Sequence, residues 1–205
     1  MIYLSILTAV IAYLLGSMNT SVLLSRAKGK DVRKEGSGNA GATNTLRVFG
    51  KGAAAVVVLG DGLKGVVAIL VARLLVSIVA VEGYASIPIY TAALCVVLGH
   101  NFPLYFGFKG GKGIMTSAAV ILMLDWRIGL AVVAFALLVM AVTRYVSLGS
   151  CLACIAFPTA VLVFHNNDVY MVALSIIMGA LALFMHRANI VRLIKGTESK
   201  LNFKK

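Results

Sequence analysis

The chain has few charged residues, which make up only 13% of its 205 positions. Apolar residues account for 60%, whereas soluble domains are closer to half apolar. The mean hydropathy is +0.98. These values exclude an ordinary soluble domain and predict an all-α, polytopic integral membrane protein.

Long polar stretches are also scarce, because seven apolar runs fill most of the chain. A helical span needs roughly 20 mostly apolar residues, and about 17 can suffice. We therefore expect about seven transmembrane helices, with six as the main alternative, in a single membrane domain. The runs cover residues 2–24, 53–81, 87–98, 114–124, 128–142, 147–164 and 169–185. The domain covers residues 1–205, and its polar motif loops are residues 26–52, 99–113 and 186–198.

Acidic residues are the scarcest charged type, since 7 Asp and Glu oppose 19 Lys and Arg and the net charge is +12. Nearly all the basic residues fall in alternate connections and in the C-terminal tail. By the positive-inside rule these connections are cytoplasmic, so the N-terminus is expected outside and the C-terminus in the cytoplasm. All three motif loops are then expected on the cytoplasmic side.

Cysteine is rare, and Cys95, Cys151 and Cys154 all fall within expected spans. No disulfide framework follows, and no cysteine is left as a cytoplasmic nucleophile. The CxxC spacing of Cys151 and Cys154 is more typical of small packing residues in a lipid-embedded helix than of a redox or zinc pair.

The first motif loop contains DVRKEGSGNAGATN at residues 31–44, followed by Arg47. Its hydroxyl and amide side chains, clustered with glycines, favour a bound oxyanion, and residues 43–49 predict a short helix. GSGNAG fits the GxGxxG pattern of dinucleotide-binding folds, but that fingerprint needs a preceding strand within a βαβ unit. The flanking membrane helices exclude it here.

The second motif loop, GHNFPLYFGFKGGKG at residues 99–113, combines glycines with Lys109 and Lys112. Glycine lets backbone N–H groups approach an anion closely. This is not a Walker A loop, because Phe106 stands where that motif needs glycine and Gly113 where it needs Ser or Thr. Backbone amides, two ammonium groups and the following helix N-terminus can still converge on a phosphate.

The third motif segment, HRANIVRLIKGTE at residues 186–198, places Ile190, Leu193 and Ile194 at helical spacing. Alone it fits a basic amphipathic tail as well as a functional segment. Its expected position on the same side as the other two loops favours function.

Two ionisable residues, Asp61 and Lys64, stand three positions apart early in the second expected span. Ionisable groups at membrane depth are costly and are usually paired or functional. We expect these two to pair with each other or with the first motif loop.

Reactive groups on the expected cytoplasmic side are few. Its carboxylates are Asp31, Glu35 and Glu198, and no two have the spacing of a magnesium site, which disfavours a metal-dependent phosphotransferase. The His-x4-Asp dyad of many glycerolipid acyltransferases is also absent. The remaining cations, amides and hydroxyls suit a site that holds two anionic substrates together and stabilises charge.

In order and spacing, the three segments resemble the three motifs of the bacterial acyl-phosphate:glycerol-3-phosphate acyltransferases, and the resemblance covers the whole chain. It implies transfer of a fatty acyl group from acyl phosphate to the 1-position of sn-glycerol 3-phosphate. Lysophosphatidic acid and phosphate would form, as the first step of phospholipid synthesis in the bacterial inner membrane. The implied partners are the two substrates and membrane lipids, with no cofactor, metal, nucleic acid or obligatory protein partner.

The resemblance also implies residue roles. Ser37, Arg47, Lys112 and His186 are expected to be catalytic, with Lys112 bridging both substrates and Arg47 on glycerol phosphate. In this family the substrate phosphate is thought to take the hydroxyl proton. The expected substrate-binding residues are Gly38, Asn39, Gly41, Thr43, Asn44, Lys109, Gly110, Gly111, Gly113, Ser147, Ser150, Asn189 and Glu198.

Two other functions stay open on the sequence, a transporter of a phosphorylated anion and a non-catalytic lipid-binding scaffold. Transporters usually carry internal repeats and bind near the bilayer midplane, and no repeat is visible here. A scaffold would tolerate Gly110→Ala and Ser37→Ala. The enzyme prediction requires the three motif segments to form one pocket near the inner leaflet.

Overall fold

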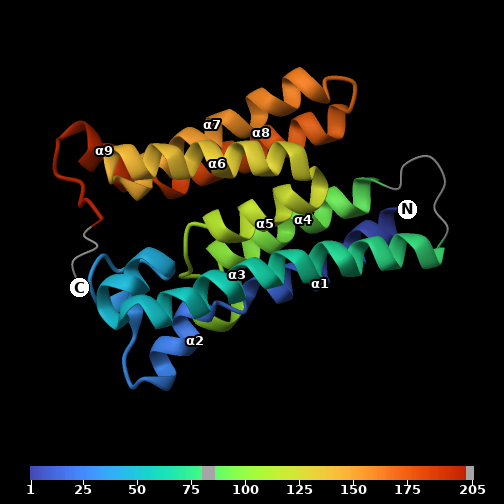
Figure 1. Ribbon diagram of the computed structural model, residues 1–205. Helices are drawn as coiled ribbons and strands as arrows, with labels where there is room; N and C mark the ends of the chain where they lie inside the picture. The colour runs from blue at the N-terminus through green and yellow to red at the C-terminus, as the bar shows by residue number, and fades with distance from the viewer. Residues whose placement is uncertain (80–85, 202–205) are drawn as a thin grey trace. The chain divides into compact units, whose positions relative to one another are not determined.

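The computed structural model describes residues 1–79 and 86–201, and these residues are helical with short connections (Figure 1). The all-α prediction is therefore confirmed for this part of the chain. The elements are α1 (Ile2–Ser17), α2 (Thr20–Ala27), η1 (Val32–Lys34), α3 (Ala42–Val79), α4 (Ser86–Asn101), η2 (Leu104–Phe106), α5 (Ile114–Leu124), α6 (Trp126–Thr143), α7 (Val146–Phe164), α8 (Val169–Met185) and α9 (Arg187–Ile194).

Within the described residues the seven apolar runs are helical apart from a break in the first, but not all are long enough to cross a bilayer. Among the described residues five helical segments pass by length and composition, and α8 with α9, bent by 61°, gives a sixth. Helix α5 has 11 residues, which span about 16 Å at 1.5 Å per residue against a hydrocarbon core of about 30 Å. Its last turn is covered by Arg73 of α3, which donates to the Met123 carbonyl. Helix α5, the fourth of the seven expected spans, is therefore shorter than a full span, and a topology with all three motif segments on one side requires α5 to cross together with its flanking residues.

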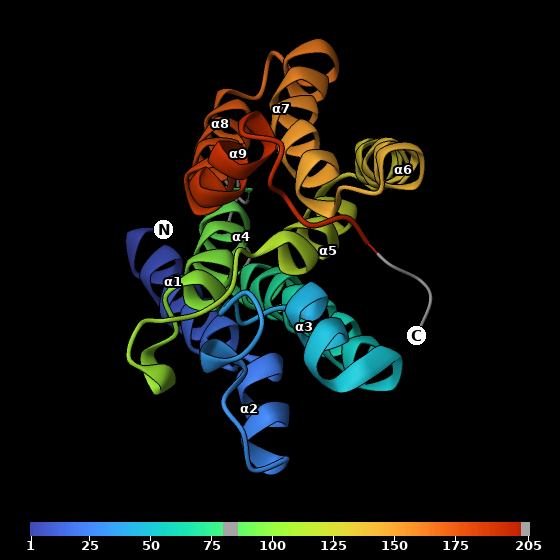
Figure 2. The same ribbon diagram turned by 90° about the vertical axis from the view of Figure 1, so that its left-hand side faces the viewer.

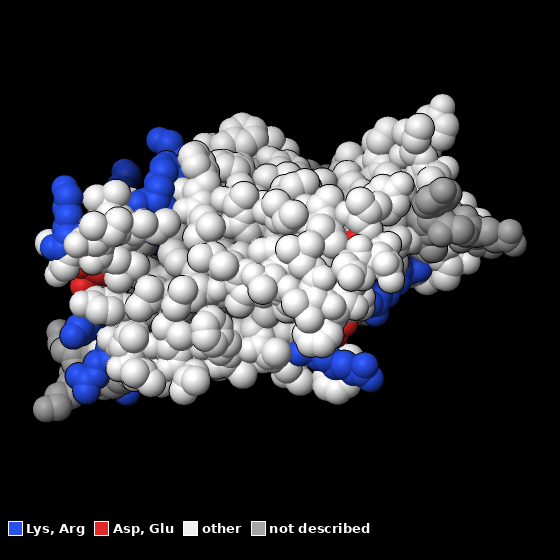
Figure 3. Space-filling view, turned by 90° about the horizontal axis from the view of Figure 1, so that it is seen from above, with Lys and Arg blue, Asp and Glu red and all other residues white. Residues whose placement is uncertain are grey.

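The surface agrees with a lipid environment. Most of the described surface visible in Figure 3 carries no Lys, Arg, Asp or Glu. Large apolar side chains such as Leu59, Leu138 and Phe164 are more than half exposed. Contiguous exposed apolar surface of this kind is what a bilayer covers.

The chain divides into two compact units, Met1–Met123 and Leu124–Lys205. In the first unit, α1 and α4 lie side by side (Figures 1 and 2). Two glycines allow this close approach. A Cβ at Gly16 would lie 2.1 Å from the Val96 carbonyl oxygen, and a Cβ at Gly99 would lie 2.2 Å from that of Tyr13. The backbones of α1 and α4 are therefore in contact at Gly16 and Gly99, where no glycine side chain separates them.

The first expected span, residues 2–24, is interrupted in the structure. Helix α1 ends at Ser17, and Asn19 starts α2 by accepting a hydrogen bond from the Val22 amide at 3.0 Å. Asn19 is a favoured N-cap residue because its side-chain oxygen satisfies an otherwise unpaired amide. Figure 2 shows α2 leaving the direction of α1.

Helix α3 is also broken, at Gly50, whose φ of 84° and ψ of −176° are not helical. Residues 42–49 form a short helix before the break, which confirms the helix expected at residues 43–49. The long apolar part follows from residue 51. Glycine adopts this left-handed φ without the penalty that a Cβ brings.

The second unit packs α7 against both α6 and α8. Glycines again mediate the contacts: a Cβ at Gly149 would lie 2.7 Å from the Ala136 carbonyl oxygen, and one at Gly179 would lie 2.5 Å from that of Cys154. Close backbone approach at small residues is the usual way in which helices associate in lipid.

We expect Gly99→Ala to destabilise the protein, because the new methyl group meets the backbone of α1 rather than a flexible side chain. Overpacking of this kind typically costs about 1–3 kcal/mol. The matched control is Gly62→Ala in α3, where a Cβ meets no atom within 4 Å. Thermal unfolding in detergent should show a clear loss for Gly99→Ala only. Equal unfolding temperatures for the two variants would contradict the backbone contact.

Candidate functional site

The first motif loop is shaped by one side-chain amide. Asn44 is 1% exposed, and its Nδ2 donates to the carbonyls of Val32 at 3.0 Å and Glu35 at 2.9 Å. Its Oδ1 accepts from the Ser37 amide at 2.8 Å. Asn44 therefore folds the loop around itself, and both of its N–H donors are used inside the protein.

The remaining expected residues of this loop surround the start of α3. Ser37 and Gly38 are exposed, and Gly38 has a φ of 71°. Arg47 is exposed one turn after Thr43. The N-terminus of a helix favours anions because its first amides lack intrahelical partners. Asn39, Gly41 and Thr43 are half-buried beside it.

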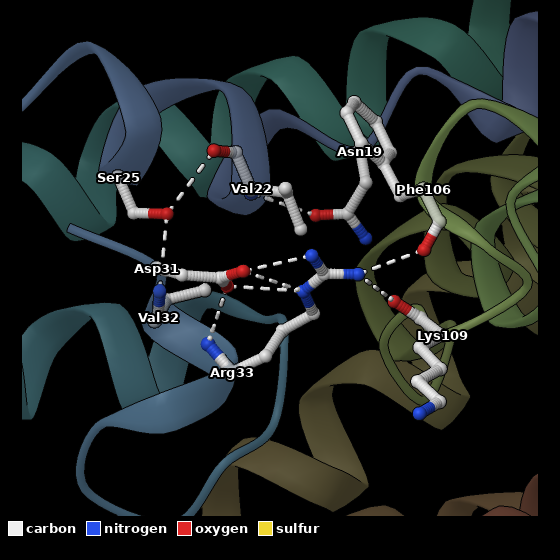
Figure 4. A network of polar contacts seen from close by, with 8 residues as sticks. All are labelled: Asn19, Val22, Ser25, Asp31, Val32, Arg33, Phe106 and Lys109. Atoms are coloured by element: carbon white, nitrogen blue, oxygen red, sulfur yellow. Dashed lines mark hydrogen bonds and ion pairs between the residues drawn. The ribbon is translucent and has the colours of Figure 1, made fainter. Parts of the chain in front are cut away.

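Arg33 joins the first motif loop to the second (Figure 4). Its guanidinium pairs with the Asp31 carboxylate at 2.8 Å and donates from Nη1 to the carbonyls of Phe106 at 2.8 Å and Lys109 at 3.3 Å. The side-chain hydrogen bond from Arg33 lowers the pKa of Asp31 to about 2. Both charges are therefore present at neutral pH, and the planar guanidinium can bond on two edges at once.

The glycines of the second motif loop serve close packing. The amides of Gly110 and Gly111 donate to the carbonyls of Asn101 and His100, both at 3.2 Å. A Cβ at Gly110 would lie 2.1 Å from the His100 carbonyl oxygen, and one at Gly111 would lie 2.4 Å from that of Ala40. These two amides are thus engaged within the protein, and the expected contact of the two glycines with a phosphate stays a prediction.

Lys112 follows these glycines and is half-buried, whereas the Lys109 side chain is exposed. Gly113 has a φ of 78°, a left-handed conformation that favours glycine. The turn at Gly113 leads directly into α5, which begins at Ile114. The first and second motif loops meet within the unit Met1–Met123 through Arg33, and the expectation that all three segments form one pocket stays a prediction.

The third motif segment lies in the unit Leu124–Lys205 and is organised by Glu198. Its Oε1 accepts from Ser147 Oγ at 2.8 Å and from Asn189 Nδ2 at 2.6 Å, and its Oε2 accepts from Arg192 Nε at 2.6 Å. Burial acts to raise the pKa of Glu198, but these hydrogen bonds outweigh it and the pKa is lowered. One carboxylate thus connects α7, α9 and the segment that follows α9.

His186 and Ser150 are close in sequence to Asn189 and Ser147, which bind Glu198. Their own side chains bond to backbone carbonyls one helical turn earlier. His186 is buried, and its Nδ1 donates to the Ala182 carbonyl at 2.8 Å where α8 turns into α9. The proton of a neutral His186 ring is therefore on Nδ1, and Nε2 carries the lone pair. Ser150 is buried too and donates to the Val146 carbonyl within α7. Their expected substrate contacts stay predictions.

The expected pairing of Asp61 with Lys64 is confirmed by a distance of 3.0 Å. Arg33 and Arg192 are organising residues outside the expected site. The Phe106 and Lys109 carbonyls bound by Arg33 lie in a loop whose approach no local pattern reveals, whereas the Glu198 acceptor of Arg192 lies in the same segment. In the described ranges 1–79 and 86–201, no three His, Cys, Asp or Glu side chains form a group that could hold a metal ion.

Known proteins with similar sequences belong to the family that the three motif segments indicate. A family model described as glycerol-3-phosphate acyltransferase matches residues 6–196. A glycerol-3-phosphate acyltransferase of Clostridioides difficile (strain 630) is 44% identical over 201 residues, covering 98% of this chain and 97% of that protein. Another, of Thioalkalivibrio sulfidiphilus, is 44% identical over 194 residues, covering 94% of this chain and 92% of that protein.

Two solved structures have the same fold. The crystal structure of PlsY, an integral membrane glycerol 3-phosphate acyltransferase, in its glycerol 3-phosphate form matches with a TM-score of 0.87 and 34% identity. That match covers 97% of this chain and 96% of PlsY. The lysophosphatidic acid form of PlsY matches with a TM-score of 0.84 at the same identity, covering 97% of this chain and 95% of PlsY.

We expect Arg33→Lys to loosen the second motif loop. A lysine ammonium is a compact donor that cannot reproduce the two-edged contact of the guanidinium with Asp31 and the two carbonyls. Hydrogen exchange of the amides in residues 104–111 should become about tenfold faster, which corresponds to roughly 1.4 kcal/mol of local stability. Lys34→Ala, at an exposed neighbouring position, is the control. Unchanged exchange in Arg33→Lys would show that the clamp does not hold this loop.

Proposed function

Because this chain belongs to the glycerol-3-phosphate acyltransferase family, we propose that it transfers a fatty acyl group from acyl phosphate to the 1-position of sn-glycerol 3-phosphate. The products are lysophosphatidic acid and inorganic phosphate. The observation that carries the proposal is the family match over residues 6–196, which includes the first two motif segments and the third up to Gly196. The contact between the first and second motif loops supports it, because it gathers hydroxyl, amide and cationic groups within one unit.

The chemistry needs little from the protein beyond orientation and charge. The 1-hydroxyl oxygen of glycerol 3-phosphate attacks the acyl carbonyl, the bond from that carbon to the phosphate oxygen breaks, and phosphate leaves with the electron pair. The departing phosphate takes the hydroxyl proton. Lys112 stabilises the negative charge that develops, which is usually the largest contribution in acyl transfer. Acyl phosphate is already activated, so no nucleotide is consumed.

The other roles follow from position and charge. Ser37 is exposed in the first motif loop. The hydroxyl and amide side chains and the glycines of this loop are suited to binding a phosphate. Arg47 binds the phosphate of glycerol 3-phosphate, since an exposed guanidinium is a good partner for that group. His186 and Asn189 contact the glycerol phosphate, and Glu198 orients Asn189 through the 2.6 Å hydrogen bond.

The chain is an integral, multi-pass membrane protein, and we infer that it resides in the bacterial inner membrane with its motif segments facing the cytoplasm. The placement of Lys and Arg supports this orientation by the positive-inside rule. Soluble glycerol 3-phosphate then arrives from the cytoplasm, while the acyl tail of the donor stays among the apolar surfaces of the helices. Both units serve one acyltransferase domain in this proposal.

A detergent assay with synthetic acyl phosphate and glycerol 3-phosphate tests the proposal. Formation of lysophosphatidic acid with equimolar phosphate, unaffected by a chelator, is the expected result. Turnover with acyl-CoA in place of acyl phosphate would overturn the donor. Uptake of labelled glycerol 3-phosphate into sealed vesicles without acylation would instead favour a transporter.

We expect Lys112→Ala to abolish measurable turnover. Removing one donor that stabilises developing charge typically lowers kcat by about 10²–10³, and here one ammonium bridges both substrates and stabilises phosphate charge on both sides of the transfer. Lys28→Ala, at an exposed position in the C-cap of α2, is the matched control and should retain activity. Near-normal kcat in Lys112→Ala would remove Lys112 from the mechanism.

For Arg47→Ala we expect a higher KM for glycerol 3-phosphate with a smaller loss of kcat. A hydrogen bond to a charged group contributes about 1.5–3 kcal/mol, so the KM should rise by roughly 10- to 100-fold. Steady-state kinetics with glycerol 3-phosphate as the varied substrate measure both constants. A large fall in kcat at an unchanged KM would contradict a binding role.

A further inference from the structure

Three buried ionisable side chains lie beneath the motif loops of the first unit. Asp61 and Lys64 belong to α3 and His100 to the last turn of α4, and they are 2%, 7% and 3% exposed. Lys64 Nζ lies 3.0 Å from Asp61 Oδ1 and 2.8 Å from His100 Nδ1. Apolar side chains would fill this space without the desolvation penalty of charges in a membrane protein. Packing alone therefore does not explain why these three ionisable side chains are buried here.

The hydrogen bonds define the state of the histidine. A lysine ammonium has three protons to donate and accepts none. Lys64 directs them to Asp61 Oδ1, to His100 Nδ1 and to the Met18 carbonyl, which lies 3.2 Å away between α1 and α2. His100 Nδ1 is therefore an acceptor, and the proton of the neutral ring lies on Nε2. Thr20 adds a donor to the same Asp61 oxygen at 3.1 Å.

The His100 ring lies beside Gly111 of the same motif loop and close to the Ala40 carbonyl of the first. Its carbonyl accepts from the Gly111 amide at 3.2 Å. On the side where Gly111 would carry a Cβ, that position lies 2.3 Å from His100 Nε2 and 2.4 Å from the Ala40 carbonyl oxygen. The imidazole and the Ala40 carbonyl therefore both close the side of Gly111 on which a side chain would stand. Asn19 also donates to the Ala40 carbonyl, at 3.4 Å.

We propose that His100, held by Lys64 and Asp61, is a positioning residue that fixes Gly111 and thereby places the ammonium of Lys112 for acyl transfer. The inference rests on the proposed function, because it assumes that Lys112 acts on the substrates. Lys112 is the residue directly after Gly111, so a shift of the glycine backbone moves the lysine with it. A displacement of about 1 Å at a reacting group can cost roughly 10²-fold in rate.

Two substitutions of His100 test separately the contact of Nδ1 with Lys64 and the contact of Nε2 with Gly111. In His100→Asn the amide oxygen comes to the place of Nδ1 and still accepts from Lys64, but no side-chain atom reaches Gly111, and only the backbone hydrogen bond from the Gly111 amide to the carbonyl of residue 100 remains. In His100→Gln the amide reaches toward Gly111, while the Nδ1 acceptor is lost. Lys64→Met is unsuitable, because it leaves the Asp61 carboxylate buried without its counter-ion and is expected to unfold the protein.

We expect His100→Asn to unfold at nearly the same temperature as the parent protein and to lose about 10- to 100-fold in kcat. The KM for glycerol 3-phosphate should change by less than about twofold, since Arg47 is intact. His100→Gln should unfold at a lower temperature, while its folded fraction retains more kcat than His100→Asn. The control is His165→Asn, the same change at the C-cap of α7 in the second unit, which should keep full activity.

A second measurement does not depend on turnover. The rate at which Lys112 reacts with an amine-modifying reagent, followed by peptide mass spectrometry, should change several-fold in His100→Asn and stay constant in His165→Asn. The exposed Lys109 is the internal reference in all three proteins.

The outcomes are distinguishable. Parental kcat per folded molecule and an unchanged Lys112 reaction rate in His100→Asn would overturn the positioning role and leave a purely structural network. The opposite ranking, an active His100→Asn and an inactive but folded His100→Gln, would overturn it as well. If instead the parent protein fails to use acyl phosphate, the proposed function fails, and if Lys112→Ala retains activity, Lys112 is removed from the mechanism. In either case the Lys112 reaction rate still reports on positioning.

Discussion

The polar segments of this membrane protein depend on side chains that use most of their hydrogen-bonding capacity inside the protein. Asn44 bonds three backbone groups of the first motif loop, and Arg33 bonds a carboxylate and two carbonyls across two loops. Glu198 accepts three hydrogen bonds in the second unit. An unpaired polar group away from water costs free energy comparable to a lost hydrogen bond. Each of these side chains therefore makes one loop conformation much more stable than its alternatives.

Glycine has the complementary role, because it allows backbones to touch where polar side chains cannot reach. The contact of Gly99 with Tyr13 packs α4 on α1, and the contact of Gly111 with Ala40 packs the second motif loop on the first. Both contacts involve backbone oxygens, which cannot move aside without deforming a helix or a loop. The glycine-rich character of the second motif loop is thus explained by the fold before any ligand is considered.

The sequence predicted the features that depend on local pattern. Hydropathy located every long helix, residues 43–49 were expected to be helical, and the spacing of Asp61 and Lys64 indicated an ion pair. The break at Asn19 was missed because the apolar run continues to residue 24, although Asn19 itself is a favoured cap. The contact of Arg73 with the last turn of α5 was not expected, because its acceptor is the Met123 carbonyl. Acceptors such as the Phe106 carbonyl are backbone groups, which no residue type identifies.

The site residues fall into two groups by what their polar atoms contact. In Asn44, Ser147 and Glu198 these atoms are bonded to other parts of the protein, so substitutions there act through the shape of the loops. Ser37 and Arg47 instead present exposed side chains on the same framework. This division suits a reaction that needs orientation and charge stabilisation rather than a protein nucleophile. The rigid group holds the geometry, and the exposed group can bond to phosphate without first breaking an internal contact.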